Sequence, residues 1–263
     1  MPFATIRLVQ NDSDLMSPGA SGSGGSKSLL GTGGAIVDCS KAIIEAGKGV
    51  AADVLEAAAE DIEFEITDGV GGFTVAGTDR AIGIMELARE KPGALDTLAH
   101  HDSSPSSFPN GCHVCEVEID PETGEVALQR YTVVDDFGLM VNPPIVEGQV
   151  QGGIAQGVGQ ILLERTVYDD DGQLITGTLM DYAVPRASHM VNIDFSTRNV
   201  PCRTTPLGVK GCGEVGAIGS PPAVINAIVD ALSSLGVTDV SMPATPEKVW
   251  RAIQSASTPQ AAE

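Results

Sequence analysis

The chain has 263 residues, a formal net charge of −20 and a pI of about 4.3. Nucleic acid and anionic membranes repel a chain of this charge, so both are excluded as partners. Hydrophobic residues make up 42% of the sequence, enough for a folded core. No apolar run reaches the roughly 18 residues that a membrane span needs. Five scattered cysteines and no signal-peptide pattern at Met1 to Gln10 predict a reducing, cytoplasmic compartment.

Periodicity in the first third of the sequence predicts a mixture of strands and helices. The expected strands are Thr5 to Val9, Asp61 to Ile66 and Phe73 to Val75, with a turn at Asp68 to Gly72. The expected helices are Gly34 to Gly47, Val50 to Ala59 and Ala81 to Arg89. Residues 91–111 are rich in Pro, Ser, His and Asn, which predicts irregular structure.

A tract of small residues ends in Gly24-Gly25-Ser26-Lys27-Ser28, shortly before the first predicted helix. Its composition is typical of a flexible linker. Backbone N–H groups, hydroxyls and one Lys at a helix start also form an anion site, typically for phosphate. The spacing of a Walker motif is absent. The residues alone leave the linker and the phosphate site both open.

The middle of the chain predicts a second hairpin, with strands around Cys112 to Ile119 and Glu125 to Val134. Cys112 and Cys115 have the spacing of a redox or zinc motif, but residues three apart on a strand face opposite sides. The neighbouring His100 and His101 point apart for a similar reason. We therefore expect no metal site built from these residues.

A helix from Ile145 to Glu164 is predicted with five glycines and four glutamines. Each interior glycine weakens a helix by roughly 1 kcal/mol relative to alanine, so this helix is expected to pack very tightly or to press against a cofactor. An amide such as Gln156 can hydrogen-bond an oxo or hydroxyl ligand, although bonding to neighbouring backbone is the commoner fate.

The C-terminal part centres on the glycine-rich loop Thr205 to Val224, which carries one carboxylate, Glu214. Glycines allow positive φ angles and close approach to a bulky ligand. A carboxylate held in such a loop can act as a general base. It can equally cap a helix or pair with Lys210. The flanking predictions are a strand at Asn192 to Ser196 and helices at Ala223 to Leu232, opened by Pro221-Pro222, and at Pro243 to Ile253.

Several stretches taken together resemble the C-terminal half of the molybdopterin-binding subunit of molybdenum hydroxylases, the family of xanthine dehydrogenase, carbon monoxide dehydrogenase and aldehyde oxidoreductase. They are Ile6 to Asp14, Gly24 to Ser28, His113 to Asp120, Gly148 to Gly157 and Gly208 to Glu214. The last stretch, followed by Pro221-Pro222-Ala223-Val224, is the most specific. The resemblance implies an α+β fold in which residues 1–263 form one molybdopterin-binding domain, with 1–30 a cofactor-loop segment. Residues 255–263, at the end of the chain, are expected to form a flexible tail.

The resemblance also implies roles for individual residues. Glu214 is the catalytic base, which deprotonates a hydroxyl on molybdenum as it attacks the substrate carbon. Gln156 hydrogen-bonds the oxo ligand of the metal. Cofactor contacts are implied for Gly24, Gly25, Ser26, Lys27, Ser28, Gly211, Cys212 and Gly213. No residue of this chain is a metal ligand, because the pterin dithiolene holds the molybdenum. The implied cofactor is molybdopterin cytosine dinucleotide.

The first half of such a subunit, an iron–sulfur cysteine pattern and a flavin domain do not occur in this sequence. The resemblance therefore implies an obligate hetero-oligomer with an N-terminal-half molybdenum chain, a [2Fe-2S] chain and an FAD chain. The complex would hydroxylate an N-heteroaromatic or aldehyde carbon with oxygen from water. The alternatives are a non-catalytic subunit that braces a partner chain, and a stand-alone domain that binds a phosphate ligand.

Overall fold

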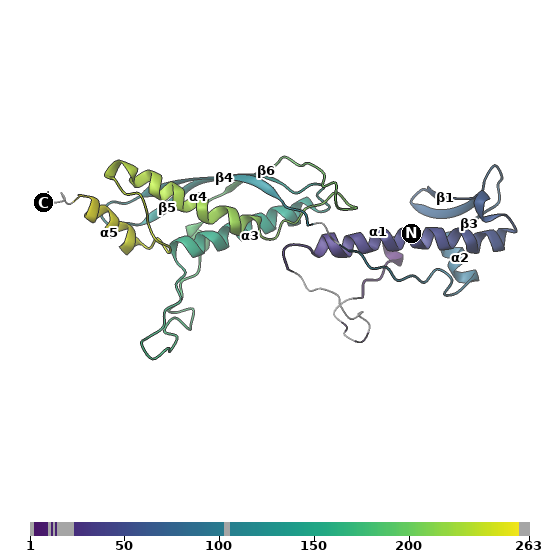
Figure 1. The fold of residues 1–263 in the computed structure, drawn as a ribbon, viewed down its shortest axis with the longest axis horizontal. Helices are drawn as coiled ribbons and strands as arrows, with labels where there is room; N and C mark the ends of the chain where they lie inside the picture. Colours follow the sequence, from purple (N-terminus) through teal and green to yellow (C-terminus); the bar gives the residue numbers. More distant parts are fainter. Residues whose placement is uncertain (1–2, 10–11, 13, 15–23, 103–105, 258–263) are drawn as a thin grey trace. The chain divides into compact units, whose positions relative to one another are not determined.

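The computed structural model describes residues 3–9, 12, 14, 24–102 and 106–257, and it confirms the predicted α+β class (Figure 1). The chain forms two compact units. The first comprises Met1–Gly24 and Ser28–Ser104, and the second comprises Gly25–Lys27 and Pro105–Glu263. The short segment Gly25–Lys27 thus belongs with the residues from Pro105 onward rather than with its neighbours in the sequence.

The first unit packs one long helix, α1 (Ser28–Leu55), on a small antiparallel sheet. The sheet has the order β1 (Ile62–Thr67), β2 (Val70–Val75), β3 (Ala81–Gly83), and α2 (Ile84–Glu90) follows it. Asp68 and Gly69 close the first hairpin with φ angles of 51° and 76°, as a two-residue turn requires. Ala51, Phe73 and Leu87 are fully buried and form the centre of this core.

Three predictions for the first unit were wrong in part. The helices expected at 34–47 and 50–59 are one continuous helix, which begins at Ser28 and ends at Leu55. Gly47 does not end a helix, because it is the position where the helix packs on Phe73. A methyl group on Gly47 would overlap the ring of Phe73. Residues 81–83 of the short predicted helix pair with β2 instead, as β3.

The strand expected at Thr5 to Val9 was also wrong. Phe3–Thr5 form a single 3-10 turn, and Ile6 to Val9 belong to no helix or strand and are exposed. Within the part of the chain that the structure describes, these residues have no ladder partner. A strand forms only when its backbone N–H and C=O groups are paired, so alternation alone does not produce one.

The second unit is built on a sheet of β4 (Asn110–Ile119), β5 (Val126–Asp136) and β6 (Ile193–Thr197). β4 and β5 are antiparallel, and β6 is parallel to β5. The predicted strands are confirmed, and Cys112 points outward while Cys115 points toward the core. The helices are α3 (Pro143–Leu162), α4 (Val215–Leu232) and α5 (Pro246–Ser257), with α4 packed against both β4 and α3.

Glycines bring the backbones of α3 and α4 into direct contact. A Cβ on Gly153 would lie 2.9 Å from the backbone nitrogen of Ala217, and a Cβ on Gly157 would overlap the Ser220 hydroxyl. A Cβ on Gly216 would lie 2.6 Å from the backbone nitrogen of Ile154. The tight packing predicted for the glycine-spotted helix is confirmed, and its partner is α4.

The helix expected to start at Ala223 in fact begins at Val215, with Pro221 and Pro222 inside it. Proline inside a helix costs about 3 kcal/mol, so the contact with α3 must stabilise the first two turns. Ser220 supports them with a hydroxyl that donates to the Gly216 carbonyl at 2.7 Å. At the end of the chain α5 extends to Ser257, so 255–257 are helical, and 258–263 lie outside the described residues.

The segment Val215–Leu235 is long and apolar enough to cross a membrane by length and composition. A single such helix is weak evidence, because core helices pass the same test. Val224, Ile228 and Leu232 belong to the core of the second unit together with residues of α3 and β5. The structure therefore accounts for the apolar character of α4 by packing.

Candidate active site

The turn Gly25–Lys27 lies directly on the loop that precedes α4. The Cβ of Ser26 is 2.7 Å from the position that a Cβ on Gly211 would take, and the Ser26 hydroxyl is 3.1 Å from that of Gly213. Gly25 and Ser26 both have positive φ angles, 60° and 55°. This close approach is possible because residues 211 and 213 are glycines. Two predicted site segments that are about 185 positions apart in the sequence therefore lie in contact.

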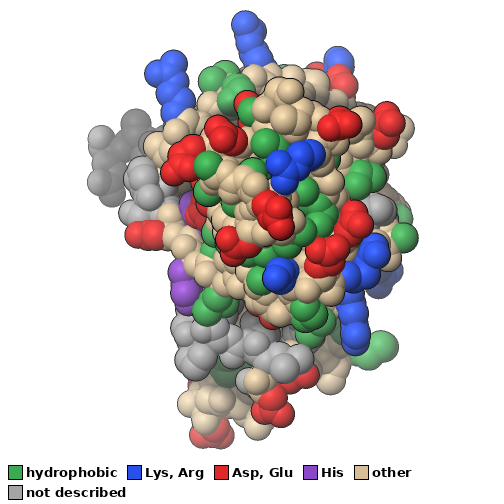
Figure 2. All heavy atoms as spheres, turned by 90° about the vertical axis from the view of Figure 1, so that its right-hand side faces the viewer, with side chains coloured by type: hydrophobic (Ala, Val, Ile, Leu, Met, Phe, Trp, Pro, Cys, Tyr) green, Lys and Arg blue, Asp and Glu red, His purple; other side chains and the backbone are tan. Residues whose placement is uncertain are grey.

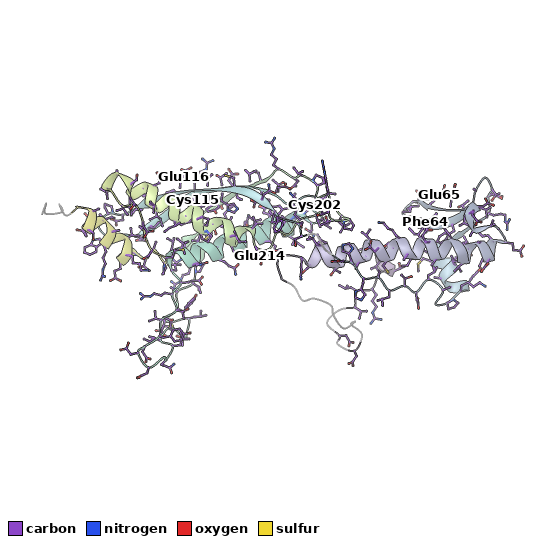
Figure 3. The ribbon with its side chains drawn as sticks, viewed as in Figure 1. Phe64, Glu65, Cys115, Glu116, Cys202 and Glu214 are labelled. Atoms are coloured by element: carbon purple, nitrogen blue, oxygen red, sulfur yellow. The ribbon has the colours of Figure 1, made fainter. Side chains whose placement is uncertain are left out.

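Glu214 is the residue immediately before α4, and Figure 3 labels it at the start of that helix. Its side chain is exposed and makes no capping hydrogen bond. No ion pair of Glu214 occurs among the described residues. The two structural roles considered for this carboxylate, a helix cap and a partner for Lys210, are therefore both absent from the described structure.

Lys210 instead pairs with Asp136 at the end of β5. Its ammonium group lies 2.6 Å from the Asp136 carboxylate and 3.4 Å from the Asn110 side-chain oxygen. Asp136 also accepts the backbone N–H groups of Gly138 and Val200, both at 2.9 Å. Burial acts to raise the pKa of the Asp136 carboxyl, but the hydrogen bonds from Lys210 and the two N–H groups outweigh it and lower that pKa.

Backbone pairing holds the rest of this loop to the segment after β5. Leu139 donates to the Gly208 carbonyl at 2.9 Å, and the Lys210 N–H donates to the Phe137 carbonyl at 2.8 Å. Gly138 and Gly208 face each other with φ angles of 66° each, and a Cβ on Gly138 would overlap the Gly208 carbonyl. These hydrogen bonds hold the loop at Gly208 and Lys210, shortly before Glu214.

α3 supplies amide side chains near this loop. Because Val150 meets Gly216 and Gly157 meets Ser220, α3 and α4 run side by side in the same direction. Gln149 therefore lies at the level of the Glu214 turn, and its side-chain oxygen is 3.8 Å from the position of a Cβ on Gly213. Sequence reasoning missed this residue, which only the parallel packing of the two helices singles out.

Gln156 lies two turns further along α3, about 10 Å from Gln149 by helical rise. It lines a cavity of about 490 Å³ in which the Tyr182 hydroxyl donates to Glu164 at 2.7 Å. The structure thus places Gln156 on the same exposed helix face as the site, beyond the turn that carries Glu214. The other cavity-lining residues are Gly157, Gln160, Thr166 and Ala217.

The surroundings of this turn leave room for a bulky ligand. Nothing lies within 4 Å of where a Cβ would stand on Gly24, Gly25, Gly148 or Gly152. Gly148 and Gly152 flank Gln149 on an exposed face of α3, so bare backbone is accessible there. The residues therefore fit a large, flat cofactor with phosphate groups, for which backbone N–H groups and hydroxyls are suitable partners.

Two other predicted cofactor contacts differ in their surroundings. Lys27 is exposed and has no hydrogen bond or ion pair among the described residues, so its charge is available to an anion. Cys212 packs against the core of the second unit, and burial raises the pKa of its thiol.

The sequence matches the family model of the molybdopterin cofactor-binding domain over residues 1–191. The large subunit of nicotine 6-hydroxylase from Paenarthrobacter nicotinovorans is 39% identical over 268 aligned positions, which cover 96% of this chain and 32% of that protein. The large chain of carbon monoxide dehydrogenase from Hydrogenophaga pseudoflava is 31% identical, with 97% and 32% covered.

Solved structures show the same relationship. Quinoline 2-oxidoreductase from Pseudomonas putida 86 superposes with a TM-score of 0.76 at 38% identity, covering 88% of this chain and 30% of that one. A Cu,Mo-CO dehydrogenase superposes with a TM-score of 0.77 at 27% identity. The chain belongs to the molybdopterin-binding subunits of the molybdenum hydroxylases and corresponds to their C-terminal part. It spans about a third of the length of these relatives.

Proposed function

We propose that this chain binds molybdopterin in its cytosine dinucleotide form and supplies Glu214 as the catalytic base of a hydroxylase. The hydroxylase acts on an N-heteroaromatic or aldehyde carbon, and the oxygen comes from water. The observation that carries the proposal is the contact of the Gly25–Lys27 turn with Gly211 and Gly213, beside the unpaired Glu214.

The cofactor would be held mainly by backbone and small polar groups. Ser26 and Ser28 offer hydroxyls and Lys27 offers a positive charge to its phosphates. Gly211 and Gly213 allow the pterin to approach the main chain, and Gln149 contributes an amide beside them. When bound, the molybdenum centre supplies the two-electron oxidation of the substrate carbon.

Glu214 is suited to hold the proton that the reaction releases. A base must be ionised before it can accept a proton, and the positive end of α4 favours a negative charge at this position. The carboxylate oxygens have no hydrogen-bond donor among the described residues, so they are available to accept. The anchored loop at Lys210 and the packed helix α4 limit where the carboxylate can move.

The substrate class rests on the named relatives. Two of them are named for nicotine and quinoline, both nitrogen heteroaromatic compounds, and these have higher identity to this chain than the carbon monoxide dehydrogenases do. We place the enzyme in the cytoplasm. We expect it to work with an N-terminal-half molybdenum chain, a [2Fe-2S] chain and an FAD chain, as the resemblance to the molybdenum hydroxylases implies.

Replacement of Glu214 by Gln tests the proposal in the purified complex, with a panel of N-heteroaromatic and aldehyde substrates and a dye acceptor. We expect E214Q to retain its molybdenum and to lose turnover by at least ~10²-fold, within the range for general base catalysis. The matched control is E122Q, an exposed carboxylate in the β4–β5 turn. Turnover of E214Q equal to that of E122Q would favour a subunit that only braces its partners.

A further inference from the structure

Beneath α4 the second unit buries three polar side chains in one cluster. The Nδ1 atom of His113 on β4 lies 2.8 Å from the Tyr131 hydroxyl, and its Nε2 atom lies 3.4 Å from Oδ1 of Asp135. The side chains of His113 and Asp135 are 6% and 0% exposed, and Tyr131 is fully buried. No step of the proposed reaction uses them.

Glycines make the space for this cluster. A Cβ on Gly111 would overlap Oδ1 of Asp135, and a Cβ on Gly219 would stand 2.7 Å from three atoms of the His113 ring. Gly219 lies in α4, five residues after Glu214. The imidazole ring therefore sets how closely the first turns of α4 approach the sheet.

The carboxylate of Asp135 has no hydrogen-bond partner on either oxygen among the described residues, and neither has Nε2 of His113. An ionised carboxylate buried without a partner costs several kcal/mol, so a cation must stand beside it or it must carry a proton. Lys210 pairs with the neighbouring Asp136 and not with Asp135.

In the described residues of β4, β5 and α4, His113 and Asp135 form an ion pair with each other and with no further charged group. α4 carries no ionisable side chain from Val215 to Val229. Burial raises the pKa of the Tyr131 hydroxyl, which therefore stays neutral. Cys115 lies on the same face of β4 as His113, and burial raises the pKa of its thiol to about 11, so it is neutral as well.

We propose that His113 and Asp135 form a buried imidazolium–carboxylate pair that positions α4 and hence Glu214 at its start. The imidazolium donates one N–H toward the Tyr131 hydroxyl and the other toward Asp135. His113 is a positioning residue, because it acts through Gly219 and α4 and does not reach the Glu214 turn. The link to Glu214 rests on the proposed function, whereas the pair itself does not.

The test compares H113Q, D135N and the double variant in the purified complex. H113Q leaves the Asp135 carboxylate without its cation and should lower the melting temperature by roughly 10 °C, since breaking a buried pair costs far more than removing both charges. D135N should restore most of this loss in the H113Q background. C112S, on the outward face of β4, is the matched control and should match the native protein.

Kinetics separate positioning from a merely structural role. We expect kcat of H113Q to fall at least about tenfold, because small misplacements of a reacting group are costly. The KM and the molybdenum content of H113Q should stay unchanged. The double variant with D135N should recover part of the lost kcat.

The proposal is overturned if the melting temperature of H113Q equals that of C112S. It is also overturned if adding D135N to H113Q does not raise the melting temperature. Should H113Q fail to fold, a folded double variant supports the pair and an unfolded one refutes it. An active E214Q would remove the proposed function, yet the melting results would still decide whether the pair exists.

Discussion

Asp135 and Asp136 are neighbours at the end of β5 and have opposite surroundings. Asp136 accepts three hydrogen bonds and holds the Glu214 loop through Lys210, whereas Asp135 accepts none and faces His113. The sequence shows two adjacent acids and one lysine in a glycine-rich loop. It does not show which of the two acids forms the ion pair with Lys210, because that depends on how the loop around Gly208 packs against the end of β5.

The Lys210–Asp136 pair should matter for both stability and turnover. In K210M the buried Asp136 keeps its two N–H donors and loses its cation, so we expect a loss of about 3 kcal/mol in the free energy of unfolding. Turnover should fall as well, since the loop loses its anchor four residues before Glu214. Urea unfolding and steady-state kinetics check this. K41M, an exposed change in α1, serves as the control, and equal behaviour of the two variants would refute the anchor.

Asp136 also predicts a response to acid. Its pKa in the folded chain lies below the ordinary value of about 3.9. The stabilisation is therefore fully present above that ordinary value and is lost as the pH falls through the lowered folded pKa. Urea unfolding from pH 6 down to about pH 3 should show a smaller acid loss in D136N than in the native protein. Equal acid losses would contradict the assignment.

At the scale of elements, alternation and helical periodicity located most strands and helices, and the errors have a common cause. Gly47 did not end α1, and Pro221 and Pro222 did not begin α4, because tertiary contacts with Phe73 and with α3 decide both cases. The glycines of α3 predicted either tight helix packing or contact with a cofactor, and the structure shows the packing. Their partner, and the direction of the two helices, needed the structure.

Contact between α3 and α4 predicts a strong effect at Gly216. A Cβ there would meet backbone atoms of Val150 and Ile154, which cannot move aside as a flexible side chain can. We expect G216A to lower the free energy of unfolding by about 1–3 kcal/mol. Chemical unfolding measures this change, and a G216A protein as stable as the native one would show that the helices are less tightly packed than described.

Gly152 is the contrasting position on the same helix, because its Cβ would face open space. G152A should keep or slightly raise stability, by up to about 1 kcal/mol, since alanine favours helix. If the cofactor lies on this face, the added methyl group should lower the molybdenum content of the purified complex. Elemental analysis of G152A tests this, and full molybdenum content would place the cofactor elsewhere.

At the scale of the whole molecule, the chain carries 35 acidic and 15 basic residues. On the face shown in Figure 2, acidic, basic and hydrophobic side chains are interspersed. A net charge of −20 opposes compaction by self-repulsion, and salt screens it. We expect the melting temperature to rise between about 0.01 M and 0.15 M NaCl, as the Debye length falls from about 30 Å to about 8 Å. A flat or falling melting temperature would mean that the acidic groups are already compensated.

The family was predictable because short motifs carry it, and two of these motifs also named the segments of the proposed site. Their union was not, since the Gly25–Lys27 turn and the loop at Gly211 are about 185 positions apart.

The most direct test is an experimental structure of the loaded complex with the molybdenum located by its anomalous scattering. The account predicts pterin density against Ser26 and Gly211, and a ligand atom of the metal within about 3 Å of the Glu214 carboxylate. Metal and pterin bound away from Glu214, with the Gly25–Lys27 turn free of cofactor, would contradict it.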